Sequence, residues 1–136
     1  MTLKLIYPAL AMIFWIFVVC VIMALRRKEA FASGAVKHED VSVSTERYPI
    51  PARLAAANFS NQFETPVLFF VLILIAIEVG ATGYVMAALA WLYVVSRVVH
   101  TFIHIGPNKL PVRGAVYSIG FLALVCMWIG VLVAVL

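Results

Sequence analysis

The sequence predicts an all-α integral membrane protein, a four-helix bundle with up-down topology. Of its 136 residues, 65% are hydrophobic and only 12% are charged, whereas soluble globular domains have about 45 to 50% apolar and about 25% charged residues. The apolar residues gather in four runs, and each is close to the roughly 20 residues that a helix needs to span a bilayer. We therefore expect a single transmembrane domain over residues 1–136.

The first helix is predicted at about residues 5–25. This run lacks charged side chains and is followed at once by Arg26, Arg27 and Lys28. A cleavable signal sequence has a shorter apolar region of about 7 to 15 residues and carries its positive charge before that region. We therefore expect a retained transmembrane helix. Because it carries no strongly polar side chain, we place it at the periphery of the bundle.

The second helix is predicted at residues 52–79, after a charged loop over residues 26–51. Pro51 favours a helix start there, since proline is tolerated at the first helical position. At about 1.5 Å per residue the helix is longer than the hydrocarbon core of about 30 Å, so its first half must extend into the interface. Pro66 removes one backbone hydrogen bond, and we expect a kink near it.

The third and fourth helices are predicted at residues 84–105 and 112–135, joined by a compact loop rich in proline and glycine. Among the ten Lys and Arg residues, Lys4 alone lies away from the two loops that fall on one side of the predicted bundle. This asymmetry predicts cytoplasmic loops and outer termini. The same asymmetry explains the net charge of +4. We therefore do not expect nucleic acid to be a partner. The short loops favour a bacterial inner membrane.

A polar stripe runs along the third helix, where Arg97, His100 and His104 share one face. Ionisable groups at such depth cost a few kcal/mol or more each, and they persist mainly where they face a protein interior or a wet cavity. Arg113 and Tyr117 share a narrow arc at the start of the fourth helix. We therefore expect a polar site at one membrane face.

The second helix adds polar groups at the same end. Eight side chains can then converge at one depth: Arg53, Asn61, Glu64, Arg97, His100, His104, Arg113 and Tyr117. Guanidinium groups bind carboxylates with two hydrogen bonds and a glutamate accepts an ammonium group, so this set suits a small zwitterionic ligand. The alternative is that these residues only pair with one another to hold the helices together. Residue type and spacing support both interpretations.

The spacing of His100 and His104 is also that of two zinc ligands on one helical face. A zinc site usually needs a third protein ligand, and the sequence has neither an HExxH motif nor a suitably spaced cysteine. We therefore predict a hydrogen-bonding role for both histidines and no metal.

Three segments resemble the MAPEG family, the membrane-associated proteins in eicosanoid and glutathione metabolism. Residues 97–117, with the Arg97, His100, Arg113 and Tyr117 pattern, resemble the end of the family's third helix and the start of its fourth. Residues 61–66 resemble its Asn-x-x-Glu motif followed by proline, and residues 24–31 resemble the basic exit from its first helix. The microsomal glutathione transferases and prostaglandin E synthases of the family show this pattern.

The resemblance implies a homotrimer that binds glutathione between neighbouring subunits at the cytoplasmic side. Arg113 would then match the arginine that stabilises the glutathione thiolate, and Tyr117 the phenol one turn further on. The remaining expected glutathione contacts are Arg26, Arg27, Arg53, Asn61, Glu64, Arg97, His100 and His104. Three positions depart from the family pattern: His104 stands where relatives often have a tyrosine, Ala57 replaces an arginine, and Gly114 replaces a serine implicated in prostaglandin isomerase chemistry.

The function that the resemblance implies is a membrane-bound, glutathione-dependent transferase or peroxidase. It would act on lipophilic electrophiles or lipid hydroperoxides that arrive from the membrane lipid. Two alternatives remain. A small four-helix transporter would typically carry a coupling carboxylate on its first helix, and residues 5–25 have none. A non-catalytic membrane regulator or scaffold is a role that some family members are thought to have.

Overall fold

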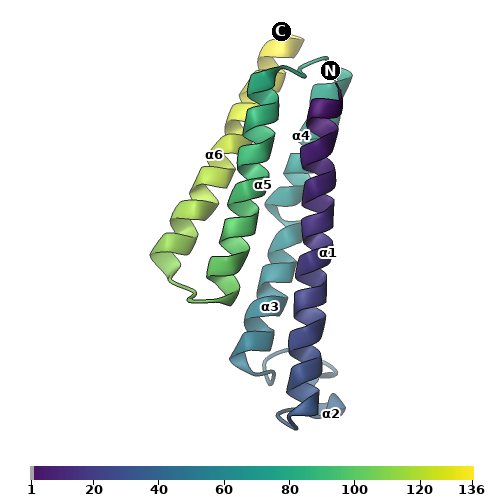
Figure 1. Ribbon diagram of the computed structural model, residues 1–136, viewed down its shortest axis with the longest axis vertical. Helices are drawn as coiled ribbons and strands as arrows, with labels where there is room; N and C mark the ends of the chain where they lie inside the picture. Colours follow the sequence, from purple (N-terminus) through teal and green to yellow (C-terminus); the bar gives the residue numbers. More distant parts are fainter. Residues whose placement is uncertain (1) are drawn as a thin grey trace.

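The computed structural model describes residues 2–136, which form helices joined by short connections, without a β-strand (Figure 1). The elements are α1 (Leu3–Ala32), α2 (His38–Val41), α3 (Ile50–Ser60), the 3₁₀ turn η1 (Asn61–Phe63), α4 (Thr65–Glu78), α5 (Tyr84–Ile105) and α6 (Leu110–Val135). Four stretches are long and apolar enough to cross a membrane: α1, the joined segment Ile50–Glu78, α5 and α6. The predicted all-α four-helix bundle is confirmed.

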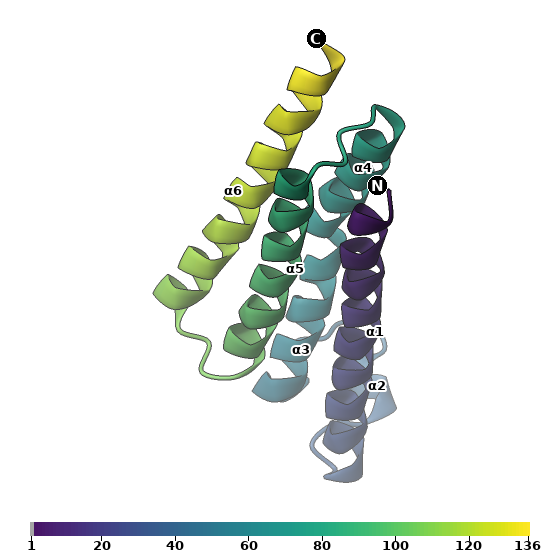
Figure 2. The same ribbon diagram turned by 45° about the horizontal axis from the view of Figure 1, so that its top comes forward.

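The four spans alternate in direction, so both termini lie at one end of the bundle (Figures 1 and 2). Helix α5 is central, since it packs against α1, α3 and α6. Leu5, Met12, Phe69, Tyr93 and Met127 are completely or almost completely buried between the helices. Many other large apolar side chains point outward, among them Phe14, Phe17, Leu122 and Trp128. An outer surface of this kind suits lipid rather than water.

Helix α1 ends at Ala32, well beyond the predicted end at residue 25. Arg26, Arg27 and Lys28 therefore lie on the helix and not in the predicted loop 26–51. The reason is that Arg, Lys, Glu and Ala are good helix formers, so the helix continues after the apolar run stops. It ends before Gly34, whose φ of +72° lies in the left-handed region that glycine adopts at little cost.

The connection between α1 and α3 is folded against the ends of both helices. Its small apolar cluster consists of Ala30, Val36, Tyr48 and Ala52. Asp40 accepts hydrogen bonds from the Lys37 backbone N–H at 3.0 Å and from Arg47 Nη1 at 2.6 Å. These two donors hold the pKa of the Asp40 carboxyl below its usual range. The segment predicted as a long loop is thus largely an ordered cap on the bundle.

The second span is interrupted between α3 and α4 and is not one helix over residues 52–79. Glu64 has φ −94° and ψ −105°, outside the helical region. Pro66 accounts for the interruption, because a proline ring clashes with the carbonyl four residues earlier and has no N–H to donate. The proline instead occupies the first turn of α4, where it is tolerated. The structure thus has a full break at Glu64 in place of the predicted kink.

Helices α5 and α6 approach each other closely at Gly120. A Cβ atom there would overlap the Ser96 hydroxyl, which donates a hydrogen bond to the Tyr93 carbonyl at 2.6 Å. Small residues at such crossings let helix backbones come close in a membrane. Gly120 is therefore a packing residue that sets how α6 lies against the buried face of α5.

We predict that Gly120→Ala lowers stability by about 1 to 3 kcal/mol, the usual cost of overpacking. The double variant Ser96→Ala/Gly120→Ala should recover most of this loss, because it removes the hydroxyl that the new methyl group meets. Thermal unfolding in detergent micelles measures both. Gly114→Ala on the same helix is the control, since nothing lies within 4 Å of that position. Equal losses in the single and double variants would rule out this contact as the cause.

Candidate functional site

The polar stripe on α5 faces the interior of the bundle. The exposed fractions of Arg97, His100 and His104 are 2%, 3% and 4%. The two histidine rings stand edge to face with their centroids 5.5 Å apart. Within residues 2–136, no three His, Cys, Asp or Glu side chains gather closely enough to hold a metal ion. The stripe therefore offers hydrogen bonds and one buried positive charge.

Arg97 reaches from α5 to the break in the second span. Its Nη2 donates a hydrogen bond to the Asn61 carbonyl at 3.1 Å, and its guanidinium carbon lies 6.0 Å from the centroid of the Tyr117 ring. Its Nε and Nη1 are covered and have no hydrogen-bond partner among residues 2–136. Buried polar groups nearly always have partners. Arg97 is therefore a buried cation with two donor nitrogens that the described residues leave without a partner.

The Asn61 side chain lies between Glu64 and His104. In the amide orientation that satisfies both neighbours, Asn61 Nδ2 donates to Glu64 Oε1 at 2.9 Å. The other amide position lies 3.4 Å from His104 Nδ1. Glu64 is exposed, and within residues 2–136 no Lys, Arg or His lies within salt-bridge distance of its carboxylate. The carboxylate is thus oriented by an amide and open to a cationic group.

Arg113 is held by the turn between α5 and α6. Its Nη1 donates to Asn108 Oδ1 at 2.7 Å. The backbone N–H of Asn108 donates to the Ile103 carbonyl at 2.8 Å, and its φ is +47°. Asparagine adopts this left-handed conformation more readily than most residues. The prediction from sequence did not include Asn108, although its place after Gly-Pro in a tight turn was a usable signal.

The groups from η1, α5 and α6 line a cavity of about 220 Å³. Its lining residues are Asn61, His100, Leu110, Arg113, Gly114 and Tyr117. The ring centroids of His100 and Tyr117 lie 5.9 Å apart. Pockets for small molecules usually have volumes of about 300 to 1,000 Å³. One chain therefore forms a polar cavity that is smaller than a typical complete binding pocket.

A network of polar side chains surrounds Thr101, the residue that follows His100 on α5. Trp15 Nε1 on α1 donates to Thr101 Oγ1 at 3.3 Å, and the Asn58 side chain on α3 lies 3.3 Å from the same hydroxyl. Gln62 Nε2 donates to the Asn58 carbonyl at 2.9 Å. These bonds join α1, α3, η1 and α5. They were absent from the predicted site, although the spacing of Asn58 and Gln62 indicated a second polar face.

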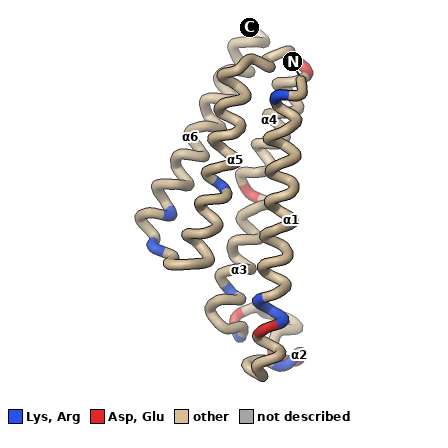
Figure 3. The backbone as a smooth tube through the Cα atoms, in the orientation of Figure 1, with Lys and Arg blue, Asp and Glu red and all other residues tan. Residues whose placement is uncertain are grey.

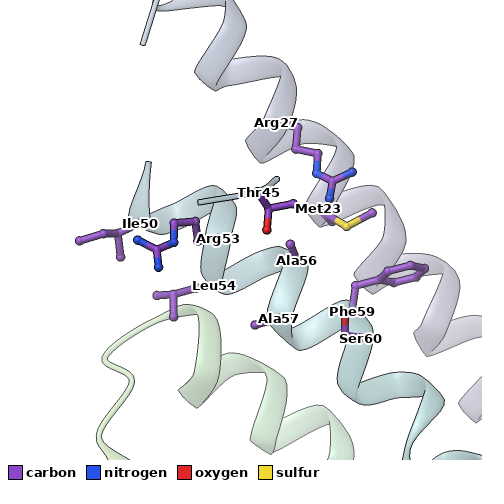
Figure 4. Close-up of a pocket in the computed structure, with 10 residues that line it drawn as sticks. All are labelled: Met23, Arg27, Thr45, Ile50, Arg53, Leu54, Ala56, Ala57, Phe59 and Ser60. Carbon is purple, nitrogen blue, oxygen red and sulfur yellow. The ribbon is translucent and has the colours of Figure 1, made fainter. Parts of the chain in front are cut away.

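Three of the predicted site residues, Arg26, Arg27 and Arg53, do not line the cavity at Arg113. Arg27 and Arg53 line a separate cavity of about 650 Å³ between α1 and α3 (Figure 4), and Arg26 forms an exposed ion pair with Glu29 at 3.4 Å. Arg53 precedes Asn61 by eight residues, about 12 Å along a helix, and α1 and α3 extend beyond the turn between α5 and α6 (Figure 1). One chain therefore does not bring these three arginines to Arg113.

Four apolar spans, with a partly open cavity near one end that is lined by polar side chains, define an integral membrane protein with a candidate site at that end. The MAPEG family model matches residues 5–133, and the chain therefore belongs to the MAPEG family. Comparisons with curated proteins and with solved structures gave no match.

We predict that Thr101→Val lowers stability by about 1 to 3 kcal/mol, because it leaves the half-buried Trp15 N–H and the buried Asn58 amide without their common partner. Unfolding of the purified protein in detergent measures the change. Ser118→Ala is the matched control, since it removes an exposed hydroxyl that bonds only to the Gly114 carbonyl of its own helix. The network would have no structural role if both variants were as stable as the wild type.

Proposed function

We propose that this protein is a membrane-bound, glutathione-dependent transferase or peroxidase. The observation that carries the proposal is the buried Arg97 guanidinium, which has two unused donors and lies close to a cavity lined by Arg113, Tyr117 and Asn61. A scaffold would have no need for an unsatisfied buried cation, which costs several kcal/mol. Membership of the MAPEG family makes glutathione the anionic ligand to expect.

The polar groups of the site fit the two ends of glutathione. The tripeptide carries two carboxylates, one ammonium group and one thiol. The unused donors of Arg97 suit a carboxylate. The exposed Glu64 carboxylate suits the ammonium group, with Asn61 holding it in place. His100 and His104 supply further hydrogen bonds from the buried face of α5.

Arg113 and Tyr117 are the proposed catalytic residues. A free thiol has a pKa of about 8.5 and is mostly protonated at neutral pH, whereas the thiolate is the nucleophile. A guanidinium beside the sulfur favours the thiolate, and each unit by which the thiol pKa falls corresponds to about 1.4 kcal/mol. The Tyr117 phenol can donate a hydrogen bond to the same sulfur. The thiolate would then bond to an electrophilic carbon, and the leaving group would depart with the bonding electron pair.

A neighbouring copy of the chain would complete the site. The cavity of about 220 Å³ in one chain is small for a tripeptide, and a second subunit packed against it would provide the remaining wall. We therefore propose the homotrimer that the family resemblance implies. Lys and Arg residues gather at the end of the bundle opposite the termini (Figure 3), which supports a cytoplasmic position for the loops and the site.

We predict that Arg113→Ala abolishes glutathione-dependent turnover and leaves the oligomer assembled, because the thiolate loses its counter-charge. Conjugation of a chlorinated nitrobenzene and reduction of a lipid hydroperoxide are the two assays, with light scattering for assembly. Lys109→Ala is the control, since it removes an exposed cation one turn earlier that does not line the cavity. Normal turnover of Arg113→Ala would remove this arginine from the mechanism.

Glu64→Gln should weaken glutathione binding more than it slows the chemical step, because the amide no longer attracts the ammonium group by charge. Isothermal titration calorimetry gives the affinity, and the rate at saturating glutathione gives the chemistry. Glu78→Gln, at the opposite end of the same span, should change neither. An unchanged affinity in Glu64→Gln would assign Glu64 a structural role only.

A further inference from the structure

Gly114 on α6 lacks the two ordinary reasons for a glycine inside a helix. The first is a left-handed backbone, and among residues 2–136 the glycines with positive φ are Gly34 and Gly80. The second is close packing, as at Gly120, whereas a Cβ atom at Gly114 would have no other part of the described chain within 4 Å. Glycine is also among the least favourable residues in a helix interior. Contacts within one chain therefore do not explain this glycine.

The helix around Gly114 is regular. The Arg113 backbone N–H donates to the Lys109 carbonyl at 2.9 Å. One turn further on, the Ser118 hydroxyl donates to the Gly114 carbonyl at 2.9 Å. All of these residues belong to α6 or to its N-cap. The helix therefore does not need a glycine at this position in order to bend.

Gly114 lines the cavity of the proposed site, together with Arg113, Tyr117 and Leu110. At about 100° per residue, Gly114 lies about 40° around the helix from Leu110 and about 60° from Tyr117. These three residues therefore share one face of α6. Leu110 is apolar and 66% exposed. The missing side chain at Gly114 thus leaves open space between an exposed apolar side chain and the Tyr117 phenol.

We propose, on the basis of the function proposed above, that Gly114 makes room for the substituent on the reacting carbon of the electrophile. When the thiolate attacks, a carbon–sulfur bond forms, the bond to the leaving group breaks, and the leaving group departs with the electron pair. Because Arg113 and Tyr117 hold the sulfur, the reacting carbon lies beside them in the same cavity. Gly114 then determines how bulky an electrophile the site accepts, and Leu110 favours an apolar substituent.

Isothermal titration calorimetry of the whole protein in detergent micelles tests this role with glutathione and S-benzylglutathione as probes. The two probes differ only by the aromatic group on the sulfur, so the ratio of their affinities reports the space for that group. Gly114→Leu should weaken the binding of S-benzylglutathione about tenfold or more and that of glutathione by about twofold at most. Gly114→Ala should have a smaller effect in the same direction, because a methyl group fills less of the space.

Turnover gives a second measurement. Iodomethane and benzyl chloride both transfer a carbon to the sulfur and release a halide ion, but the benzyl group is larger. The ratio of kcat/KM for benzyl chloride to that for iodomethane should fall about tenfold in Gly114→Leu. Thermal unfolding should show no loss of stability in Gly114→Ala, since alanine favours a helix more than glycine does.

Ala115→Leu is the matched control, because Ala115 is exposed on the same turn and does not line the cavity. It should leave both affinities unchanged. Equal losses for the two probes in Gly114→Leu, or no loss for either, would overturn the role of Gly114. A changed oligomeric state of Gly114→Leu in light scattering would also overturn it and would make Gly114 a packing residue between subunits. Wild-type protein that binds no glutathione would instead contradict the proposed function itself, and this role with it.

Discussion

The hydrogen bond from Arg97 to the Asn61 carbonyl is the contact around which the polar interior is arranged. In an unbroken α-helix that carbonyl would accept the N–H of residue 65. Pro66 interrupts the helix at Glu64, so the carbonyl at the break can turn toward α5. The break before Pro66 thus gives a buried guanidinium its acceptor. Without this acceptor, the desolvation of the buried cation would destabilise the bundle with no hydrogen bond to offset it.

Helix α5 can carry this charge because its other contacts fix it on two sides. The Thr101 hydroxyl is bonded to Trp15 of α1 and lies against Asn58 of α3, so one flank is tied to both helices. On the other flank, Gly120 lets α6 approach the Ser96 hydroxyl. The side chains that we propose to bind the ligand are therefore already held in place before it arrives. Less conformational entropy is lost when a ligand binds to such a preorganised site.

Periodicity and hydropathy predicted the four spans and the buried Arg97 stripe, because both depend on neighbouring residues in the sequence. They did not predict the end of α1, where good helix formers continue past the apolar run. They also grouped Arg53 with Arg113. The angular position of a residue on a helix says which face it occupies, but it does not say how far along the helix the residue lies. Asn108 was missed for another reason: its hydrogen bond to Arg113 depends on a left-handed backbone that exists only in the folded turn.

The two pairs of arginines, Arg97 with Arg113 and Arg27 with Arg53, lie in different surroundings within one chain. Near Arg97 and Arg113 lie imidazole, amide and phenol groups, which can make hydrogen bonds along the whole length of a small polar molecule. Around Arg27 and Arg53, apolar side chains stand beside the hydroxyl groups of Thr45 and Ser60. Because one chain keeps the two pairs of arginines apart, only a neighbouring chain can bring them together, which agrees with the homotrimer that we propose.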